Sequence, residues 1–450
     1  MATTPAEWLP ILTGRLDARQ PRIARLRRYS NGHAPLPEMG KNTKATWQAF
    51  QKKARTNYGG LTCESLGGRM IPNGVSIGSK SKSPAVTEAE RIWRNNRLDV
   101  VFADAIFDML SVSLSYLITG TRDGDAIITA EPPEQVITAP DPAQPWRARA
   151  ALKAWRDPDL GLDYALVWVP GVRQLFQRSS KNSNGTPIGL TAGDWTAEAE
   201  PESYDGGVPV YVLENDKGVA EFEPHIDVLD RINLGKLQRL VTTAMQAYKQ
   251  RAMKGGLPQE DEDGNSIDWA KILEPAPGAL WDLPEGIDVW ESGQTDITPL
   301  LKGEESDGRD FAGVTQTPLS VFIPSGDNQS AEGAQNSQKG QILKAKNRIA
   351  RASAPMEAAL VAALRIRGLD DGSTVQLLWQ PPEHISFAEK TLAATQAKAA
   401  GVSGHWIKRN IMGMSPDEIQ QDDQDAASEM LQQFALTGAG NAPSNPAPAQ

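Results

Sequence analysis

A long stretch with the period of an α-helix is the feature that most constrains the fold of this chain. From Glu332 to Arg367 the apolar residues recur every three or four positions, which is the spacing of one helix face. They are Ile342, Ala345, Ile349, Ala352, Met356, Leu360 and Leu364. At 1.5 Å per residue such a helix is about 54 Å long, and Pro355 inside it removes a hydrogen-bond donor. The pattern therefore predicts a long kinked helix lying across a large subunit.

Acidic residues are concentrated in one segment of the chain. The 450 residues carry a net charge of -10, and residues 257–308 hold fourteen Asp or Glu against two Lys. The preceding segment, 231–256, has six Lys or Arg and no acid; its apolar spacing is helical, and Gly255-Gly256 is a suitable C-cap. We therefore expect a basic helix that leads into a small acidic module, followed by a second helical passage. The overall charge disfavours nucleic-acid binding over the whole surface, but a local basic site is compatible with it.

The remaining sequence mixes short strands with helices. "SLSYLITGTRDGDAIIT" predicts a hairpin around Asp123-Gly124, and "DYALVWVPGVRQLFQRS" predicts a second strand pair. "DVVFADAIFDMLSVSLSYLI" carries Asp104 and Asp108, so it indicates an amphipathic soluble helix running into a strand and not a membrane span. The Arg-rich run "RLDARQPRIARLRRYSNG" is interpreted as a solvated helix face. These patterns together predict an α+β fold.

Motifs for catalysis and metal binding are weak. Gly74–Gly78 matches G-x-S-x-G, which would make Ser76 a nucleophile. The elbow needs a helix directly after the second Gly, whereas "SKSKSP" follows, so a turn and a short strand are favoured. "DEDGNSIDWAKI" has Ser266 where a calcium loop needs Gly, and we interpret it as an acidic hairpin tip. The single cysteine and the four histidines show no ligand spacing, so we expect no metal, no cofactor and no enzyme.

The order of these parts resembles a known family. The stretches that carry it are "RIARLRRYSNGHAPLP", "AERIWRNNRLDVVFADAIFDMLSVSLSYLITG" and "TPLSVFIPSG". With the basic helix, acidic insert, second helix and long helix between and after them, the chain resembles the portal proteins of tailed double-stranded DNA bacteriophages, of the siphophage type. The resemblance covers about residues 8–425, and the ordered set carries it, since no single motif is diagnostic.

The resemblance implies a portal fold with named parts. The wing, mixed α/β, would comprise residues 1–231 and, with the long kinked helix and a strand, 332–380. Two stem helices would lie at 232–256 and 306–322, on either side of a small α/β clip at 257–305. A tunnel loop would follow at 323–331, a helical crown at 381–435, and a disordered tail at 436–450.

The resemblance also implies a function and partners. It implies a homo-oligomeric ring of twelve copies at one capsid vertex, through which a separate motor, whose large terminase subunit docks on it, drives double-stranded DNA. The same channel would later release the DNA. The other partners implied are a head-tail adaptor or connector protein and the major capsid or scaffolding protein, with no membrane and no cofactor. The chain would be made in the host cytoplasm and end in the virion.

Candidate site residues follow from this reading. The tunnel-loop residues expected nearest the DNA are Ser325, Gly326, Asp327, Asn328 and Gln329; a polar loop with one acid would not hold phosphates tightly. Weaker candidates for the channel are Lys249 and Lys254. The acids expected to dock terminase and connector are Glu260, Asp261, Asp263, Asp282, Glu285, Asp288 and Glu291. The stem cations Lys236, Arg239 and Arg251 would either pair with acids of the neighbouring stem or line the channel, and both alternatives stay open.

Two other functions remain as alternatives. One is a non-portal head or adaptor protein of a virion, which would bind other subunits without forming a channel. The other is a serine hydrolase centred on Ser76. The acidic insert between two helices, together with the long helix, favours the portal.

Overall fold

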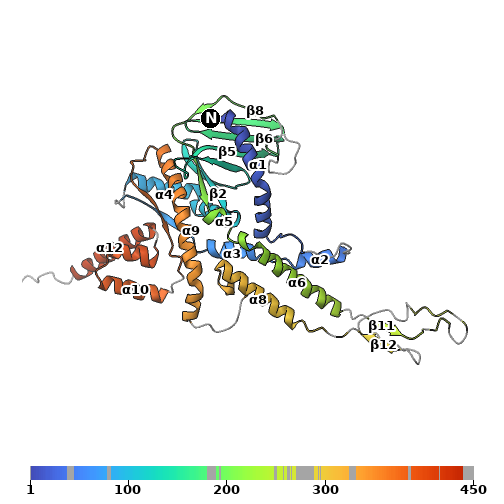
Figure 1. Cartoon of the computed structure of the whole chain (residues 1–450). Helices are drawn as coiled ribbons and strands as arrows, with labels where there is room; N and C mark the ends of the chain where they lie inside the picture. Colours follow the sequence, from blue (N-terminus) through green and yellow to red (C-terminus); the bar gives the residue numbers. More distant parts are fainter. Residues whose placement is uncertain are drawn as a thin grey trace, which may run out of the picture. The chain divides into compact units, whose positions relative to one another are not determined.

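The chain folds into two compact units of mixed α+β class, as predicted (Figure 1). The computed structural model describes residues 2–37, 45–78, 83–179, 189–191, 194–247, 251–256, 258–260, 264, 266–269, 288–291, 293, 295–323, 331–383, 387–414 and 416–438. Unit 1 comprises residues 1–34, 57–226 and 311–450, and unit 2 comprises residues 35–56 and 227–310. Residues 35–56 thus group with residues 227–310; their assignment to the wing stays a prediction.

The strands of unit 1 form antiparallel sheets. Their bounds are β1 Pro72–Ile77, β2 Leu114–Arg122, β3 Asp125–Glu131, β4 Val136–Pro140, β5 Ala148–Asp157, β6 Leu162–Val169, β7 Val172–Ser179, β8 Thr196–Ala197, β9 Glu202–Ser203, β10 Val210–Glu214 and β13 Val375–Trp379. The described sheets have the orders β10-β2-β3, β1-β13 and β4-β5-β6-β7-β8, with β9 also pairing with β7.

Both predicted hairpins are confirmed. Arg122 pairs with Asp125 at the end of β2 and β3, and the two residues between them, Asp123 and Gly124, have φ of 54° and 81°. Positive φ at both central positions is the backbone of a type I′ turn, which suits the twist of a hairpin. β6 and β7 likewise pair up to Val169 and Val172.

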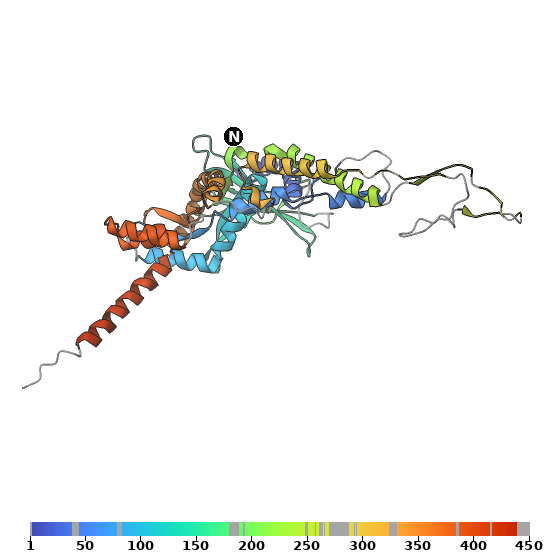
Figure 2. The same ribbon diagram turned by 90° about the horizontal axis from the view of Figure 1, so that it is seen from below.

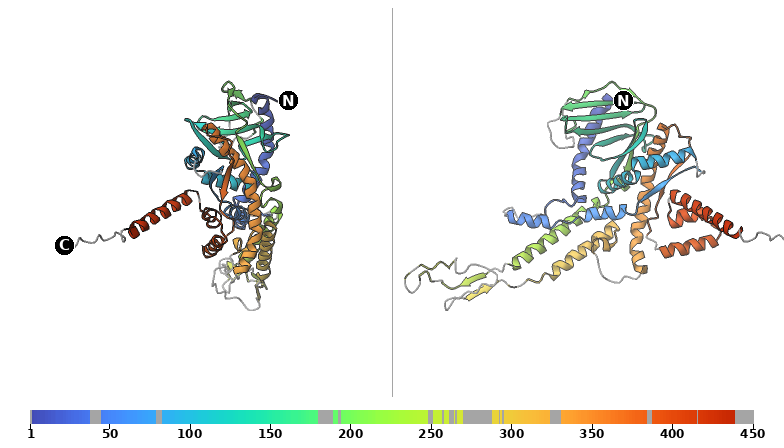
Figure 3. Two further views of the ribbon diagram at one scale, coloured as in Figure 1. Left: turned by 90° about the vertical axis from the view of Figure 1, so that its left-hand side faces the viewer. Right: turned by 180° about the vertical axis from the view of Figure 1, so that it is seen from behind.

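Helix α1 (Pro5–Ser30) lies across the larger sheet of unit 1 (Figure 3). Thr4 and Glu7 cap its N-terminus reciprocally. Leu12 and Leu16 are fully buried against the sheet, in one cluster with Leu152 and Val167. Complete burial of a leucine side chain stabilises the folded protein by about 1.5–3 kcal/mol.

Two arginines of α1, Arg22 and Arg27, are paired, which corrects the prediction of a solvated face at these positions. Arg27 forms ion pairs with Asp108 at 2.5 Å and Glu134 at 2.6 Å, and Arg22 pairs with Glu223 at 2.6 Å. Their partners are far away in sequence, so the local pattern of charges did not contain this information.

The other helices of unit 1 include the long one that the sequence predicts. Their bounds are α3 Tyr58–Gly67, α4 Pro84–Asn96, α5 Leu98–Val112, α9 Ala331–Ile366, α10 Phe387–Ala399, α11 Gly404–Ile407 and α12 Pro416–Gly438, with short turns η1 Asp216–Gly218, η2 Glu223–His225, η3 Leu319–Val321 and η4 Lys408–Met412. Helix α9 matches the predicted bounds within one residue and continues through Pro355. Its Ala352, Met356 and Leu360 are fully buried, as the apolar stripe requires. The predicted tail begins inside α12, whose last residue is Gly438.

Unit 2 contains α2 (Ala45–Lys53), β11 (Arg251–Lys254), β12 (Asp288–Glu291), all of α6 (Ile226–Ala247) except its first residue, and α8 (Thr298–Thr315) as far as Asp310, since the last turn of α8 belongs to unit 1. Helices α6 and α8 run alongside each other (Figures 1 and 2). The prediction of one helix over 231–256 is wrong at its C-terminal end, because the helix stops at Ala247 and 251–254 form a strand. The second stem helix also begins earlier than predicted, at Thr298, and ends at Thr315.

Among the described helices, none combines the length and hydropathy that a membrane crossing requires.

Candidate functional site

Most of the predicted site residues lie outside the described part of the chain. These are Lys249, Asp261, Asp263, Asp282, Glu285 and the tunnel-loop residues Ser325, Gly326, Asp327, Asn328 and Gln329. The structure describes Lys254, Glu260, Asp288 and the backbone of Glu291. The site is therefore built from the elements that flank these segments.

The β11–β12 ribbon pairs residues of opposite charge. Lys254 is the register partner of Asp288, and Arg251 that of Glu291. Directly opposed charges of unlike sign, such as Lys254 and Asp288, stabilise an antiparallel pair by roughly 0.2–1 kcal/mol. Lys254 is thus exposed on a strand, where the sequence had placed it on a helix, and Asp288 faces a cation of its own ribbon. An isolated bridge between Glu260 and Ser266 fits the predicted acidic hairpin tip.

Cations of α6 pair with acids of α8 in the same chain. Arg239 Nε lies 2.6 Å from Glu304 Oε1. Arg231 lies 2.9 Å from Asp307 and 3.0 Å from Asp310. From the sequence, Arg239 was expected either to pair with an acid of a neighbouring copy or to line a channel. In the structure it does neither within this chain, because it pairs with Glu304 of the same chain. Within unit 2 the two helices therefore neutralise much of each other's charge.

The α9 anchor, formed by Glu221, Lys344 and Arg348, holds the N-terminal half of α9. Lys344 Nζ is 2.5 Å from Glu221 Oε2, and Arg348 Nε is 2.6 Å from Glu221 Oε1. The side chain of Glu221 is only 1% exposed. Burial raises the pKa of Glu221, but the two cations outweigh it and hold that pKa below its ordinary value. Lys344 also donates to the carbonyl oxygen of Thr315 at 2.9 Å, which ties the last turn of α8 to α9.

Aromatic rings pack where the chain leaves α8 toward residues 324–330. Tyr58 lies 4.9 Å from Phe322 and 6.4 Å from Phe311, measured between ring centroids, and the two phenylalanines are 5.3 Å apart. Phe311 is fully buried. On the other side, Arg69 donates to Gln341, which in turn donates to Ser65. The described residues on both sides of 324–330 are therefore firmly packed in unit 1.

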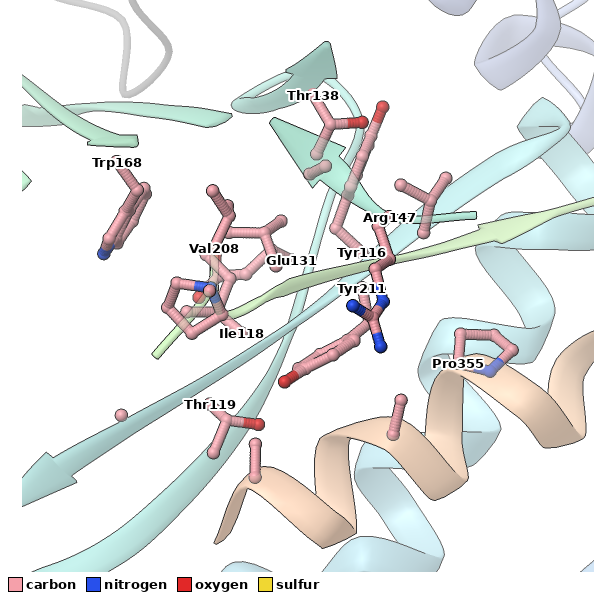
Figure 4. Close-up of a pocket in the computed structure, with 18 of the residues that line it drawn as sticks. Tyr116, Ile118, Thr119, Glu131, Thr138, Arg147, Trp168, Val208, Tyr211 and Pro355 are labelled. Carbon is pink, nitrogen blue, oxygen red and sulfur yellow. The ribbon is translucent and has the colours of Figure 1, made fainter. Parts of the chain in front are cut away.

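A cavity of about 1970 Å³ lies in unit 1 between its sheets and the second half of α9 (Figure 4). Tyr211 and Arg147 project between the strands and the helix turn that carries Pro355 (Figure 4). Burial raises the pKa of Tyr211 to about 12. The lining contains neither Cys nor His.

The family model of phage portal proteins, SPP1 Gp6-like, matches residues 11–429, which is nearly the whole chain. The chain belongs to this family of phage portal proteins. The portal function expected from the sequence is thereby confirmed, and a portal protein is a component of the virion.

Solved structures from a gene transfer agent (GTA) particle are similar to this portal protein. A chain of the "Neck of native GTA particle computed with C12 symmetry" has 12% identity and a TM-score of 0.45 over 86% of this chain and 98% of the other. A chain of the "Virion of native gene transfer agent (GTA) particle" has 14% identity and a TM-score of 0.42 over 87% and 99%. One of the "Neck of empty GTA particle computed with C6 symmetry" has 13% identity and a TM-score of 0.44 over 81% and 90%. No curated protein matches the sequence.

The described residues do not support the alternative function of a serine hydrolase centred on Ser76. Ser76 is in β1, paired with Gln376, and the next described helix is α4, which begins at Pro84. Ser76, His405 and Asp423 do line one cavity of about 340 Å³. Asp423 accepts a hydrogen bond from Lys408 at 2.6 Å, and no hydrogen bond among the described residues joins Asp423 to His405 to orient its ring. A triad needs that orientation as well as a bond from the base to the serine.

Metal and thiol chemistry have no site among the described residues either. No cluster of three His, Cys, Asp or Glu side chains with a geometry that could hold an ion occurs in this part of the chain. Cys63 is completely buried, and burial raises the pKa of its thiol. A buried thiol with a raised pKa is a poor nucleophile.

Proposed function

We propose that copies of this portal protein assemble into a closed ring whose channel passes double-stranded DNA into the capsid and later out of it. The observation that carries the proposal is the family match over residues 11–429. The expected ring has twelve copies at one vertex. The chain itself acts as a conduit and not as an enzyme, since its sequence has no nucleotide-binding loop and the motor is a separate terminase.

Exposed apolar side chains on α6 and α8 support assembly. Leu234 and Met245 on α6 and Leu301 on α8 are 38%, 49% and 46% exposed. An apolar surface of this kind becomes buried when a copy meets its neighbour in a closed ring with head-to-tail contacts. We assign the stem to these two helices, with the wing in the sheets of unit 1.

The pairing of stem cations with stem acids supports the proposal that DNA slides through the channel. Each phosphate that a cation neutralises adds affinity and therefore resists movement. Arg231 and Arg239 are occupied by Asp307, Asp310 and Glu304. Contact with moving DNA is then left to the polar residues Ser325 to Gln329, which lie outside the described residues.

The acidic segment 257–305 is proposed as the clip that docks terminase and later the connector. Its excess of carboxylates supports recognition by charge complementarity. Because Asp288 is paired with Lys254 across the ribbon, Glu260, Asp261 and Asp263, at the predicted hairpin tip, are the main docking candidates. The capsid or scaffolding protein is the further partner proposed for the ring.

Electron microscopy of the purified full chain tests the proposal. We expect end-on views of rings with a central hole, and a mass near 580 kDa, twelve times the chain mass of 48.7 kDa. A non-portal adaptor would form particles without an open channel. Only monomers or dimers at micromolar concentration would contradict the proposal.

A further inference from the structure

We propose that α2 and the residues just after it form a phosphate-binding surface, here called the α2 basic surface, made of Lys52, Lys53 and Arg55. It lies in unit 2 and binds the backbone of double-stranded DNA without reading its sequence. The choice of DNA as ligand rests on the proposed function, in which the assembly handles this polyanion. The surface is distinct from residues 323–331, which the sequence indicated as the DNA contact.

The segment that contains the α2 basic surface is positively charged in an acidic chain. Residues 41–55 contain five Lys or Arg and no Asp or Glu, in a protein whose net charge is -10. Lys52 and Lys53 are exposed at the C-terminal end of α2. A local group of like charges repels itself, so a solvent-facing group of this kind is stabilised when an anion binds it.

The cations of the α2 basic surface have no carboxylate partner among the described residues, in contrast to those of α6. No ion pair is described for Lys52, Lys53 or Arg55, and Arg55 Nε is buried without a hydrogen bond. Arg231 and Arg239 in the same unit are both paired with acids. Cations already held by carboxylates gain little from phosphate, so the α2 basic surface is the better phosphate ligand.

The α2 basic surface is attached firmly to the rest of unit 2. Thr56 donates two hydrogen bonds to Asn233 Oδ1 on α6, from its backbone nitrogen and from its hydroxyl, both at 3.0 Å. Asn233 is 2% exposed, and Ala54 is fully buried. Gln51 donates to the carbonyl oxygen of Pro37 at 2.6 Å. The side chains between these anchors therefore extend from a fixed backbone, which lowers the entropy cost of binding.

The chemistry favours a nucleic-acid backbone over a protein surface. Lysine is depleted in the buried centre of protein–protein interfaces, whereas an ammonium group on a flexible stem contacts phosphate from many directions. Lys53 Nζ lies 5.9 Å from the centroid of the Phe50 ring, which leaves its charge available. We expect these cations to contact phosphates, which carry no sequence information, so the binding would be independent of sequence.

Fluorescence anisotropy with a labelled DNA duplex of about 30 base pairs tests the inference on the assembled full-length protein, at salt from about 50 to 200 mM. We expect Lys52→Ala with Lys53→Ala to weaken binding of AT-rich and GC-rich duplexes equally. The slope of log affinity against log salt should fall by about 1 for each lysine that contacts phosphate.

A matched control removes the same charge elsewhere. Lys217→Ala with Lys398→Ala changes two exposed lysines outside segment 41–55 and should leave the slope at its parental value. If the Lys52/Lys53 variant binds DNA with the parental affinity and salt slope, the inference is wrong. If this variant binds DNA normally but no longer captures an acidic virion protein, the surface binds protein and the inference is also wrong. Rings seen by electron microscopy for every variant separate this result from failure of the proposed function.

Discussion

Lys344 on α9 and Glu221 after β10 form a buried ion pair of 2.5 Å, and the same ammonium group holds the last turn of α8 through the carbonyl oxygen of Thr315. One side chain thus joins the two helices that precede and follow residues 324–330. Because Glu221 is nearly inaccessible to water, its charge depends on Lys344 and Arg348.

Replacing Lys344 by Met should destabilise the protein markedly. The change leaves Glu221 with Arg348 as its remaining cation and removes the donor to Thr315, and breaking a buried pair costs about 3 kcal/mol or more. Chemical denaturation of the variant and the parent measures the difference. Lys346→Met is the matched control: Lys346 pairs with Glu383 but its side chain is 54% exposed, so its loss should cost less than about 1 kcal/mol. Equal effects of the two changes would refute the role of burial.

The free energy of unfolding should decrease in acid because Glu221 becomes protonated. Its pKa in the folded protein is below the ordinary value because Lys344 and Arg348 outweigh the effect of burial. A lowered folded pKa stabilises the protein above the unfolded pKa of about 4.3, and this contribution disappears as pH falls through the folded pKa. Glu221→Gln should be less stable than the parent at pH 7 and should lose less stability on acidification. Parallel curves for the two proteins would show that Glu221 does not titrate in this way.

A charge introduced into the apolar surface of the stem should prevent ring assembly without unfolding the chain. Leu301→Asp places a carboxylate in the apolar surface proposed to meet a neighbouring copy, and an unpaired carboxylate is costly to bury. We expect mass photometry to show loss of the ring and circular dichroism to show parental helix content. Leu160→Asp, at a turn between β5 and β6 where Leu160 is 63% exposed, should still form rings. A ring of normal mass from Leu301→Asp would place this face outside the interface.

Reversing the hairpin-tip acids should impair docking. The change Glu260→Lys with Asp261→Lys and Asp263→Lys turns a negative surface into a positive one, so a partner recognised by charge should associate more slowly and bind more weakly. Rings should persist in the micrographs. Glu198→Lys with Glu200→Lys and Asp205→Lys in unit 1 makes the same change in net charge. If packaging with the first variant proceeds at the parental rate, these acids do not dock the terminase.

Deleting Gly326 to Gln329 should preserve the ring and lower DNA packaging or retention. The loop sequence is too polar to contribute to a core, and the flanking residues are held independently by Lys344 and by the Tyr58–Phe322 contact. Ring formation and the length of packaged DNA are the two measurements. A deletion variant that packages full-length DNA at the normal rate would show that the loop is dispensable.

Local sequence determined the elements whose stabilisation is local. The stripe from Ala345 to Leu364 predicted α9 to within one residue, because a period of 3.6 places every one of those side chains on the same face. Asp123-Gly124 predicted its hairpin because few residues adopt positive φ at both central positions of the turn. The order of such elements, together with the acidic insert, was also sufficient to identify the portal family.

Only the tertiary structure decided features that depend on distant partners. Residues 251–254 continue a helical pattern in sequence, yet they form a strand because 288–291 supply the hydrogen bonds of its ladder. Arg27 resembles a solvated cation until Asp108 and Glu134 approach it. Residues 35–56 belong with unit 2 because Thr56 bonds to Asn233. Charge pairing and strand pairing require a second segment at close range, and sequence spacing alone does not specify which segment that is.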